Sequence, residues 1–432
     1  MRKESHSILN LAVVVAALGY FVDIYDLLLF TIVRKPSLVD IGVTDAGMIA
    51  ASAKIIDLQM VGLLIGGVVW GIMGDRKGRL SVLFGSIMLY SVANFLTGYV
   101  QTVDQYAWAR FAAGIGLAGE LGAGITLVSE LLPKEKRGIG TSLVAGVGLF
   151  GAVFAYFIFQ ATQGWSLPYD ILGFEGVIEG GWRLCYKIGG GLGIMLLLLR
   201  ISVAESGMFH AIKDKQVSQG NFLMFFNNAK RFRKYVLAIM IGLPTWFVIG
   251  ILVNYSDKFA QALYGANAID SGRSIMFGYV GIAIGDILIG FVSQFFGSRK
   301  KALFLFYGLS IVSMLFYFSG ANDSDTRMYL ACGMLGFSTG FWAIFVTMGA
   351  EQFGTNLRAT AATTIPNMVR GALPLINYLF LKVFQGSLGW TILQSAAVTG
   401  TLVMLIAVTA AWFTEETFHK DLNYVETEEM FP

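Results

Sequence analysis

The sequence predicts an all-α membrane protein with twelve transmembrane helices, arranged as two pseudo-symmetric halves of six helices each. Hydrophobic residues make up 56% of the chain and charged residues 14%, against roughly 25% charged residues in a typical soluble domain. Mean hydropathy is +0.66 over all 432 residues. The apolar runs are continuous rather than alternating, which favours helices over the strands of a membrane barrel.

Twelve apolar stretches are each long enough to cross the hydrocarbon core of a bilayer, which takes about 20 helical residues. A polar gap separates the sixth stretch from the seventh. The predicted spans are 8–33, 46–73, 80–100, 105–130, 138–162, 184–201, 235–256, 273–296, 302–320, 327–352, 359–383 and 391–413. We therefore expect an N-terminal six-helix half over 1–201, a cytoplasmic linker over 202–234, a C-terminal six-helix half over 235–413 and a cytoplasmic tail over 414–432.

The first apolar run carries two acids, Asp23 and Asp26. They interrupt the run, and no small-residue cleavage site follows, so we read it as the first membrane helix rather than a signal peptide. Three residues apart, the acids share one helix face. A carboxylate there costs about 2.5–3.5 kcal/mol on insertion scales, so such residues usually face a water-filled cavity. Both acids are candidates for proton coupling, with a structural hydrogen-bonded pair as the alternative.

The loop between the second and third spans reads GIMGDRKGR over 71–79. It resembles the signature loop of the major facilitator superfamily, G-x-L-x-D-R-x-G-R-K, with Met73 in place of the leucine and Leu80 in place of the last basic residue. The resemblance implies a transporter that works by alternating access. It also implies that Asp75, Arg76 and Arg79 belong to a cytoplasmic gate.

The fourth span opens with Arg110, in the run RFAAGIGLAGELGAG. This run is similar to the family's R-x-x-x-G-x-G motif, which implies that Arg110 neighbours the first-helix acid Asp26. Arginine stays charged at any accessible pH, so it would hold Asp26 in its anionic form until the two separate. The alternative is an arginine that extends to the outer surface. Glu120 resembles a segment of metabolite symporters and is a substrate or coupling candidate; a structural hydrogen bond is its alternative.

Two helix-end segments, 130–138 and 351–359, align without gaps. Glu130 and Arg137 of the first recur as Glu351 and Arg358 of the second, which indicates duplicated halves. In the family these residues join the signature loop in a charge network that latches the cytoplasmic side. The alternative is a solvated surface cluster that contributes little.

Between the sixth and seventh spans lies the predicted linker. Its segment 221–234 mixes aromatic residues with a basic end, which suits a helix on the cytoplasmic surface. Most Lys and Arg residues fall in the loops that would be cytoplasmic if both termini were inside. The positive-inside bias therefore predicts a multi-pass protein of the inner membrane with both termini in the cytoplasm.

Arg370 lies in the middle of the eleventh span, between Pro366 and Pro374. Prolines allow local unwinding beside a cavity, and an arginine inside a membrane indicates a binding or counter-ion site. Its forked donors would suit a carboxylate or a phosphate. The alternative is a structural pair with Asp286 or Glu351. Further candidate contacts along the cavity are Asn254, Tyr255, Asn367 and Gln160, and then Gln59, Trp246 and Asn377.

No nucleotide-binding motif or metal-ligand cluster accompanies these residues. Three histidines and two well-separated cysteines give no metal-like spacing, and a net charge of +3 gives no reason to expect nucleic acid. We expect no cofactor and no enzymatic activity. The expected partners are a small-molecule substrate, protons and the lipid bilayer, and the protein is expected to be a monomer.

The sequence thus favours a secondary active transporter, proton-coupled and specific for an organic anion. It resembles the metabolite:proton and sugar-porter-like branches of the major facilitator superfamily. A sugar or phosphate symporter and an uncoupled facilitator are alternatives, as is a non-transporting membrane sensor that kept the fold.

Overall fold

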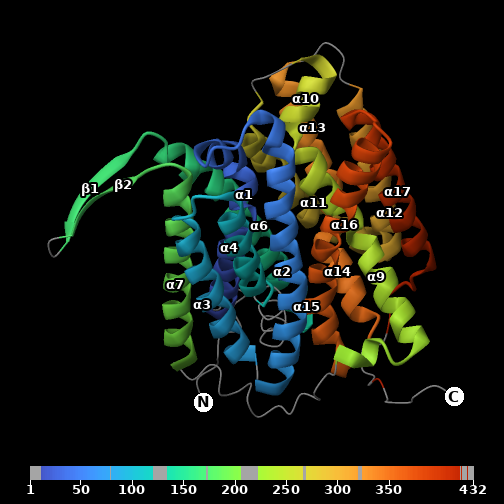
Figure 1. Cartoon of the computed structure of the whole chain (residues 1–432). Helices are drawn as coiled ribbons and strands as arrows, with labels where there is room; N and C mark the ends of the chain where they lie inside the picture. Colours follow the sequence, from blue (N-terminus) through green and yellow to red (C-terminus); the bar gives the residue numbers. More distant parts are fainter. Residues whose placement is uncertain are drawn as a thin grey trace.

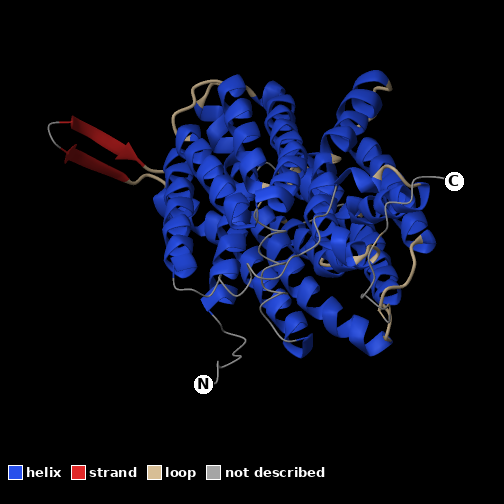
Figure 2. Cartoon of the chain, turned by 90° about the horizontal axis from the view of Figure 1, so that it is seen from below, coloured by secondary structure: helices blue, strands red, loops and turns tan. Residues whose placement is uncertain are grey.

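Long helices, packed side by side, form almost the whole body of the protein (Figures 1 and 2). The computed structural model describes residues 11–77, 79–119, 134–171, 174–205, 222–265, 269–319, 324–418, 420 and 426. Within these residues, nine helical segments are long and apolar enough to span a membrane, and Phe84–Thr97 is a shorter apolar helix. Helices occupy described parts of all twelve predicted spans.

The first half of the sequence contributes six long helices. Each follows one predicted span, and α4 is described only as far as Leu117. The elements are α1 Leu11–Asp40, the 3-10 turn η1 Asp45–Gly47, α2 Met48–Lys77, α3 Arg79–Thr97, α4 Val103–Leu117, α6 Lys134–Thr162 and α7 Trp182–Glu205.

In the second half, three spans are broken into shorter pieces. The seventh and eleventh spans each contain a π-helical segment, a feature that is frequent at functional sites. The elements are η2 Phe222–Phe225, α9 Ala229–Phe247, η3 Val248–Val253, α10 Ser256–Tyr264, α11 Ser271–Phe296, α12 Arg299–Phe318, α13 Asp325–Ser338, α14 Trp342–Glu351, α15 Thr355–Gly371, α16 Leu373–Asn377, η4 Tyr378–Ser387 and α17 Ile392–Phe413.

Local sequence signals fix several of these helix ends. The Asp270 side chain accepts a hydrogen bond from the backbone of Gly272 at the start of α11, and Gly297 ends that helix with φ +56°, a backbone conformation that glycine adopts without strain. Thr391 and Gln394 form a capping box at the start of α17.

A β-hairpin, which the sequence analysis did not predict, projects sideways from one end of the bundle (Figures 1 and 2). Its strands are β1 Ser166–Ile171 and β2 Phe174–Glu179, paired antiparallel with Ser166 opposite Glu179. We call this end of the bundle the hairpin end. The opposite end, where α12 begins and α17 finishes, is called the tail end.

Helices from the two halves of the sequence meet along the middle of the bundle. α11 packs against α1 and α6, and α15 and α16 pack against α2. Glycines bring the last pair close together. A Cβ added at Gly67 would lie 2.9 Å from the Asn367 side chain, and one added at Gly371 would lie 2.4 Å from Leu64. This contact places α15 directly against the first half.

Gly114 shows how closely α4 approaches α2. A Cβ at this position would lie 2.3 Å from the main-chain oxygen of Gln59, which cannot move without shifting the helix. We expect Gly114→Ala to lower the free energy of unfolding by about 1–3 kcal/mol, a usual cost of overpacking. Thermal unfolding of the purified variants in one detergent measures this. The matched control is Gly308→Ala in α12, because no heavy atom lies within 4 Å of a Cβ there. Equal melting temperatures for the two variants would contradict the expectation.

The predicted linker falls mainly outside the described residues, since nothing is described between 205 and 222. Beyond it come η2 and then α9, whose first residue is Ala229 and whose N-terminus is capped by the Asn228 side chain. The four-part domain division and the surface helix over 221–234 stay predictions.

Candidate functional site

Arg110 lies at a junction of the first four helices and is fully buried. Its NH2 group donates to the main-chain oxygen of Asp26 at 2.7 Å, and its NH1 group donates to Asn94 Oδ1 at 2.5 Å. Its Nε donates to Gln59 Oε1 at 3.2 Å. The guanidinium also lies 5.3 Å from the centre of the Tyr186 ring. Arg110 is therefore an internal residue that holds helices together.

Gln59 completes a clamp on α1. Its side-chain nitrogen donates to the main-chain oxygen of Leu27 at 2.9 Å. Together with Arg110, it binds the carbonyls of two consecutive residues of α1, Asp26 and Leu27. The clamp fixes the height and rotation of α1 at the level of the Asp26 side chain.

Asp26 is the buried acid that this clamp positions, with 0% of its surface exposed. The Asn94 side chain lies beside the carboxylate, whose two oxygens make no close, well-aligned hydrogen bond within the described part of the chain. Oδ1 packs against α7, where a Cβ added at Gly189 would lie 2.3 Å from it. Arg110 is thus a neighbour of Asp26, but in this conformation it binds the main-chain oxygen of Asp26 and not the carboxylate.

The other acid of α1, Asp23, is also buried, with 5% of its surface exposed. It lies near Tyr20, one turn earlier on the helix, and Tyr20 hydrogen-bonds the side chain of Arg370. The first helix therefore presents one acid toward the first-half cluster and one toward a second cluster, centred on Arg370.

Arg370 of α15 is 4% exposed and is enclosed by polar and aromatic side chains. Its NH1 group donates to Asn367 Oδ1 at 3.2 Å. The guanidinium carbon lies 5.9 Å from the ring centre of Trp246 and 5.5 Å from that of Trp342. Two indoles and a tyrosine from three different spans thus surround one buried charge.

Several donors of this cluster have no acceptor within the described residues: Arg370 Nε, Trp246 Nε1 and Trp342 Nε1. Buried donors without acceptors are rare in proteins and call for an explanation. The two acids that the sequence offered as partners of Arg370 make hydrogen bonds elsewhere. Asp286 instead accepts a hydrogen bond from the Ala343 backbone at 3.0 Å, at the start of α14. Glu351 accepts one from Arg299 at 2.7 Å.

Asn367 links this cluster to the first half of the chain. Its Nδ2 donates to the main-chain oxygen of Ala118 at 3.0 Å, beyond the C-terminal end of α4, and also to Thr363 O. Glu120, the candidate two residues after Ala118, lies outside the described residues.

The remaining substrate candidates occupy different places. Asn254 follows the π-helical segment η3, is fully buried, and has no hydrogen-bond partner at either amide atom within the described chain. Tyr255, next to it, is equally buried. Asn377 donates to Asp57 Oδ1 at 2.6 Å. Gln160 is exposed on α6, two residues from the helix end, and no contact in the described chain joins it to Arg370.

At the tail end, the described gate residues make contacts within the second half of the chain. Besides the Arg299–Glu351 pair, Arg358 donates to the Phe353 carbonyl at 3.3 Å. The Glu416 carboxylate accepts from the Ser298 hydroxyl and from the first backbone NH groups of α12. The side chains of Asp75, Arg76, Arg79 and Arg137, and the whole of Glu130, lie outside the described residues. A gate that joins the two halves there stays a prediction.

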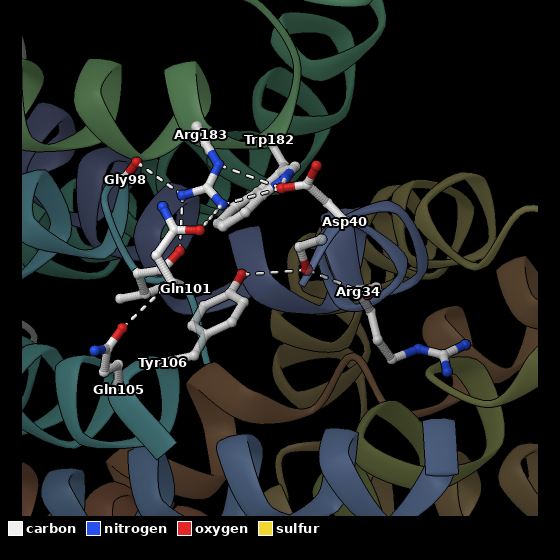
Figure 3. A network of polar contacts seen from close by, with 10 residues as sticks. Arg34, Asp40, Gly98, Gln101, Gln105, Tyr106, Trp182 and Arg183 are labelled. Atoms are coloured by element: carbon white, nitrogen blue, oxygen red, sulfur yellow. Dashed lines mark hydrogen bonds and ion pairs between the residues drawn. The ribbon is translucent and has the colours of Figure 1, made fainter. Parts of the chain in front are cut away.

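A polar network at the hairpin end was not anticipated from the sequence (Figure 3). Arg183 pairs with Asp40 at 3.0 Å and donates to the Val100 carbonyl at 2.7 Å. The Tyr106 hydroxyl donates to Ser37 at 3.4 Å. The sequence signal for these residues is their position in or beside an apolar run. The Arg34 side chain extends away from this network (Figure 3).

Comparison with known proteins identifies relatives along most of the chain. The Major Facilitator Superfamily model matches residues 9–376. The inner membrane metabolite transport protein YhjE of Escherichia coli is 28% identical over 382 residues, covering 83% of this chain and 82% of the relative. The cis,cis-muconate transport protein of Acinetobacter baylyi is 24% identical and covers 94% of each chain. The niacin transporter NiaP of the same species is 25% identical and covers 95% of each.

Among solved structures, the proton:xylose symporter XylE has the same fold. Its TM-score is 0.68 at 17% sequence identity, covering 95% of this chain and 97% of that one. At that identity the likeness concerns the fold alone.

Proposed function

This chain belongs to the major facilitator superfamily, a family of transporters, and we propose that it is a proton-coupled symporter that carries a small organic anion into the cell. In the proposed orientation, the hairpin end faces outward and the tail end faces the cytoplasm, in line with the positive-inside bias. Substrate would reach the buried clusters from each side in turn.

The observation that carries the proposed substrate class is the surroundings of Arg370. A buried arginine in a membrane protein calls for an anionic group beside it, and Asp286 and Glu351, the two acids that the sequence offered, make hydrogen bonds elsewhere. The free Nε of Arg370, with the two free indole NH groups nearby, offers several donors to an acceptor that the described chain does not provide. A carboxylate has two oxygens that together accept several hydrogen bonds. Two of the relatives are named for organic acids, muconate and niacin, which agrees with this assignment.

Asp26 is the proposed coupling acid. It is fully buried, and Arg110 binds its main-chain oxygen. As an anion it would be attracted by Arg110, and in protonated form it would not. Movement of α1 relative to Arg110 during the transport cycle would therefore change its affinity for a proton. Asp23, closer to the Arg370 cluster, is the second coupling candidate.

Uptake by purified protein in liposomes tests the proposed function. We expect an imposed inward proton gradient to drive accumulation of cis,cis-muconate or nicotinate, and a protonophore to abolish it. Xylose and inorganic phosphate serve as comparison substrates. Accumulation of xylose alone would refute the organic anion, and uptake indifferent to the protonophore would refute proton coupling. Absence of counterflow with every substrate would favour the non-transporting sensor.

A further inference from the structure

One ion pair at the hairpin end joins the two halves of the sequence. Arg34 NH2 of α1 lies 2.6 Å from Asp257 Oδ1 of α10. The arginine side chain is 0% exposed and the aspartate side chain 13% exposed. The Tyr255 ring centre lies 5.3 Å from the guanidinium. Removing one partner of a buried pair is costly, because it leaves the other charge buried and unpaired.

Asp257 accepts hydrogen bonds from only some of the donors of the Arg34 guanidinium. The Nε and NH1 groups of Arg34 have no hydrogen-bond acceptor within the described residues. A guanidinium offers five donors in a fixed fork, which matches a carboxylate. Arg34 therefore retains donors that a second anionic group can occupy.

The backbone of Arg34 is fixed to the first half of the chain. Ser37 donates to the Arg34 carbonyl at 3.2 Å, and Tyr106 of α4 donates to Ser37. The Tyr106 hydroxyl also lies 2.8 Å from the Tyr186 hydroxyl. Through these contacts to α4 and α7, Arg34 would move with the first half whenever the halves separate.

Other groups complete the closure at this end. Asn377 of α16 donates to Asp57 of α2 at 2.6 Å, a second bond between the halves. The Tyr255 hydroxyl lies beside Ser52 of α2, with Asp57 and Asp257 also near it. Arg34 is thus the cation of a small group of acids and hydroxyls that spans both halves.

We propose that the Arg34–Asp257 pair is the outer latch of the transporter, and that Arg34 is also the first binding contact for the carboxylate of the substrate. While the hairpin end is closed, Asp257 occupies the guanidinium. When the halves separate, Asp257 leaves with α10 and a substrate carboxylate takes its place on Arg34. The incoming anion thereby compensates the lost ion pair and favours the open state. The recruitment step rests on the proposed function, whereas the latch does not.

Labelling of a buried reporter tests the latch without any substrate. Ser52 is fully buried, so Ser52→Cys should react slowly with a membrane-impermeant maleimide added to intact cells. Added to this background, Asp257→Asn and Arg34→Gln should each accelerate labelling about tenfold or more, the effect of losing roughly 1.4 kcal/mol or more from the closed state. The double variant Arg34→Asp with Asp257→Arg should restore slow labelling.

The control is Asp104→Asn, which removes the exposed Lys54–Asp104 pair within the first half and should leave the labelling rate unchanged. Size-exclusion profiles of the purified variants report folding, and Arg34→Lys is the milder variant if Arg34→Gln misfolds. Unchanged labelling in both Asp257→Asn and the Arg34 variant would overturn the latch.

Kinetics of nicotinate uptake separate recruitment from latching, because both single variants open the latch but only one keeps the arginine. Arg34→Gln should raise KM for nicotinate about tenfold, while Asp257→Asn should leave KM unchanged or lower it. Equal increases in KM in both variants would show that Arg34 acts only as part of the latch, and would overturn the recruitment step. If the wild-type protein transports none of the anions tested, the proposed function and recruitment both fail, and the labelling result still decides the latch.

Discussion

Replacing Arg370 with alanine is expected to weaken the binding of organic anions strongly while the protein remains folded. Asp286 and Glu351 make hydrogen bonds elsewhere, so we expect the fold to survive the removal of Arg370. A hydrogen bond to a charged group contributes about 1.5–3 kcal/mol, so losing one such bond weakens binding by about 10- to 150-fold. Arg370→Lys should fall between the wild type and Arg370→Ala, because a point charge cannot reproduce the fork of the guanidinium.

Ligand affinity and melting temperature, measured on the same purified variants, test this expectation. Muconate and nicotinate are the ligands, and quenching of tryptophan fluorescence is a suitable signal because Trp246 and Trp342 lie beside the guanidinium. Arg327→Ala, at a partly exposed arginine near the hairpin end, is the matched control. A large fall in melting temperature for Arg370→Ala, rescued by Asp286→Asn, would instead identify Arg370 as the structural partner of a protein acid.

Replacing Asp26 with asparagine is expected to abolish uptake driven by a proton gradient and to spare substrate exchange. Asparagine has nearly the same shape and is permanently neutral, so it mimics the protonated acid at every pH. The carrier can then still alternate with substrate bound, but it cannot release a proton to complete the coupled cycle. The main-chain oxygen of Asp26, which binds Arg110, is unchanged by the substitution.

Gradient-driven uptake and counterflow in the same liposome preparation separate the two activities. Asp23→Asn is the comparison variant, because it neutralises the other acid of the same helix face. Asp26→Asn protein that still accumulates substrate against a gradient would show that Asp26 is not the coupling acid. If Asp23→Asn loses accumulation instead, the coupling role passes to Asp23.

The sequence by itself determined the fold class and the family. Continuous apolar runs near bilayer length must be helices, because backbone groups in lipid have to be satisfied within the segment. Helices accordingly occupy described parts of all twelve predicted spans. The apolar runs also made the unusual residues easy to identify, because charged residues are rare in membrane-spanning segments. These residues are Asp26, Arg110 and Arg370. Arg110 was expected beside Asp26 from a family motif, and it does contact that residue.

Only the tertiary structure decided which partners these charges have. The sequence left Asp286 and Glu351 open as counter-ions of Arg370; in the structure, one caps α14 and the other pairs with Arg299. Trp342 had no assigned role until α14 placed its ring beside the guanidinium. Arg34 and Asp257 lie 223 residues apart and were not linked by any pattern.

The physical reason is that apolar periodicity fixes where a helix crosses the membrane, but not its rotation or its vertical offset against a distant helix. Those two quantities depend on packing across the whole bundle, such as the glycine contacts between α2 and α15. Small changes in either would exchange the neighbours of Arg34, Asp26 and Arg370. The identity of each buried charge could therefore be predicted from the sequence, whereas its partner could be found only in the folded protein.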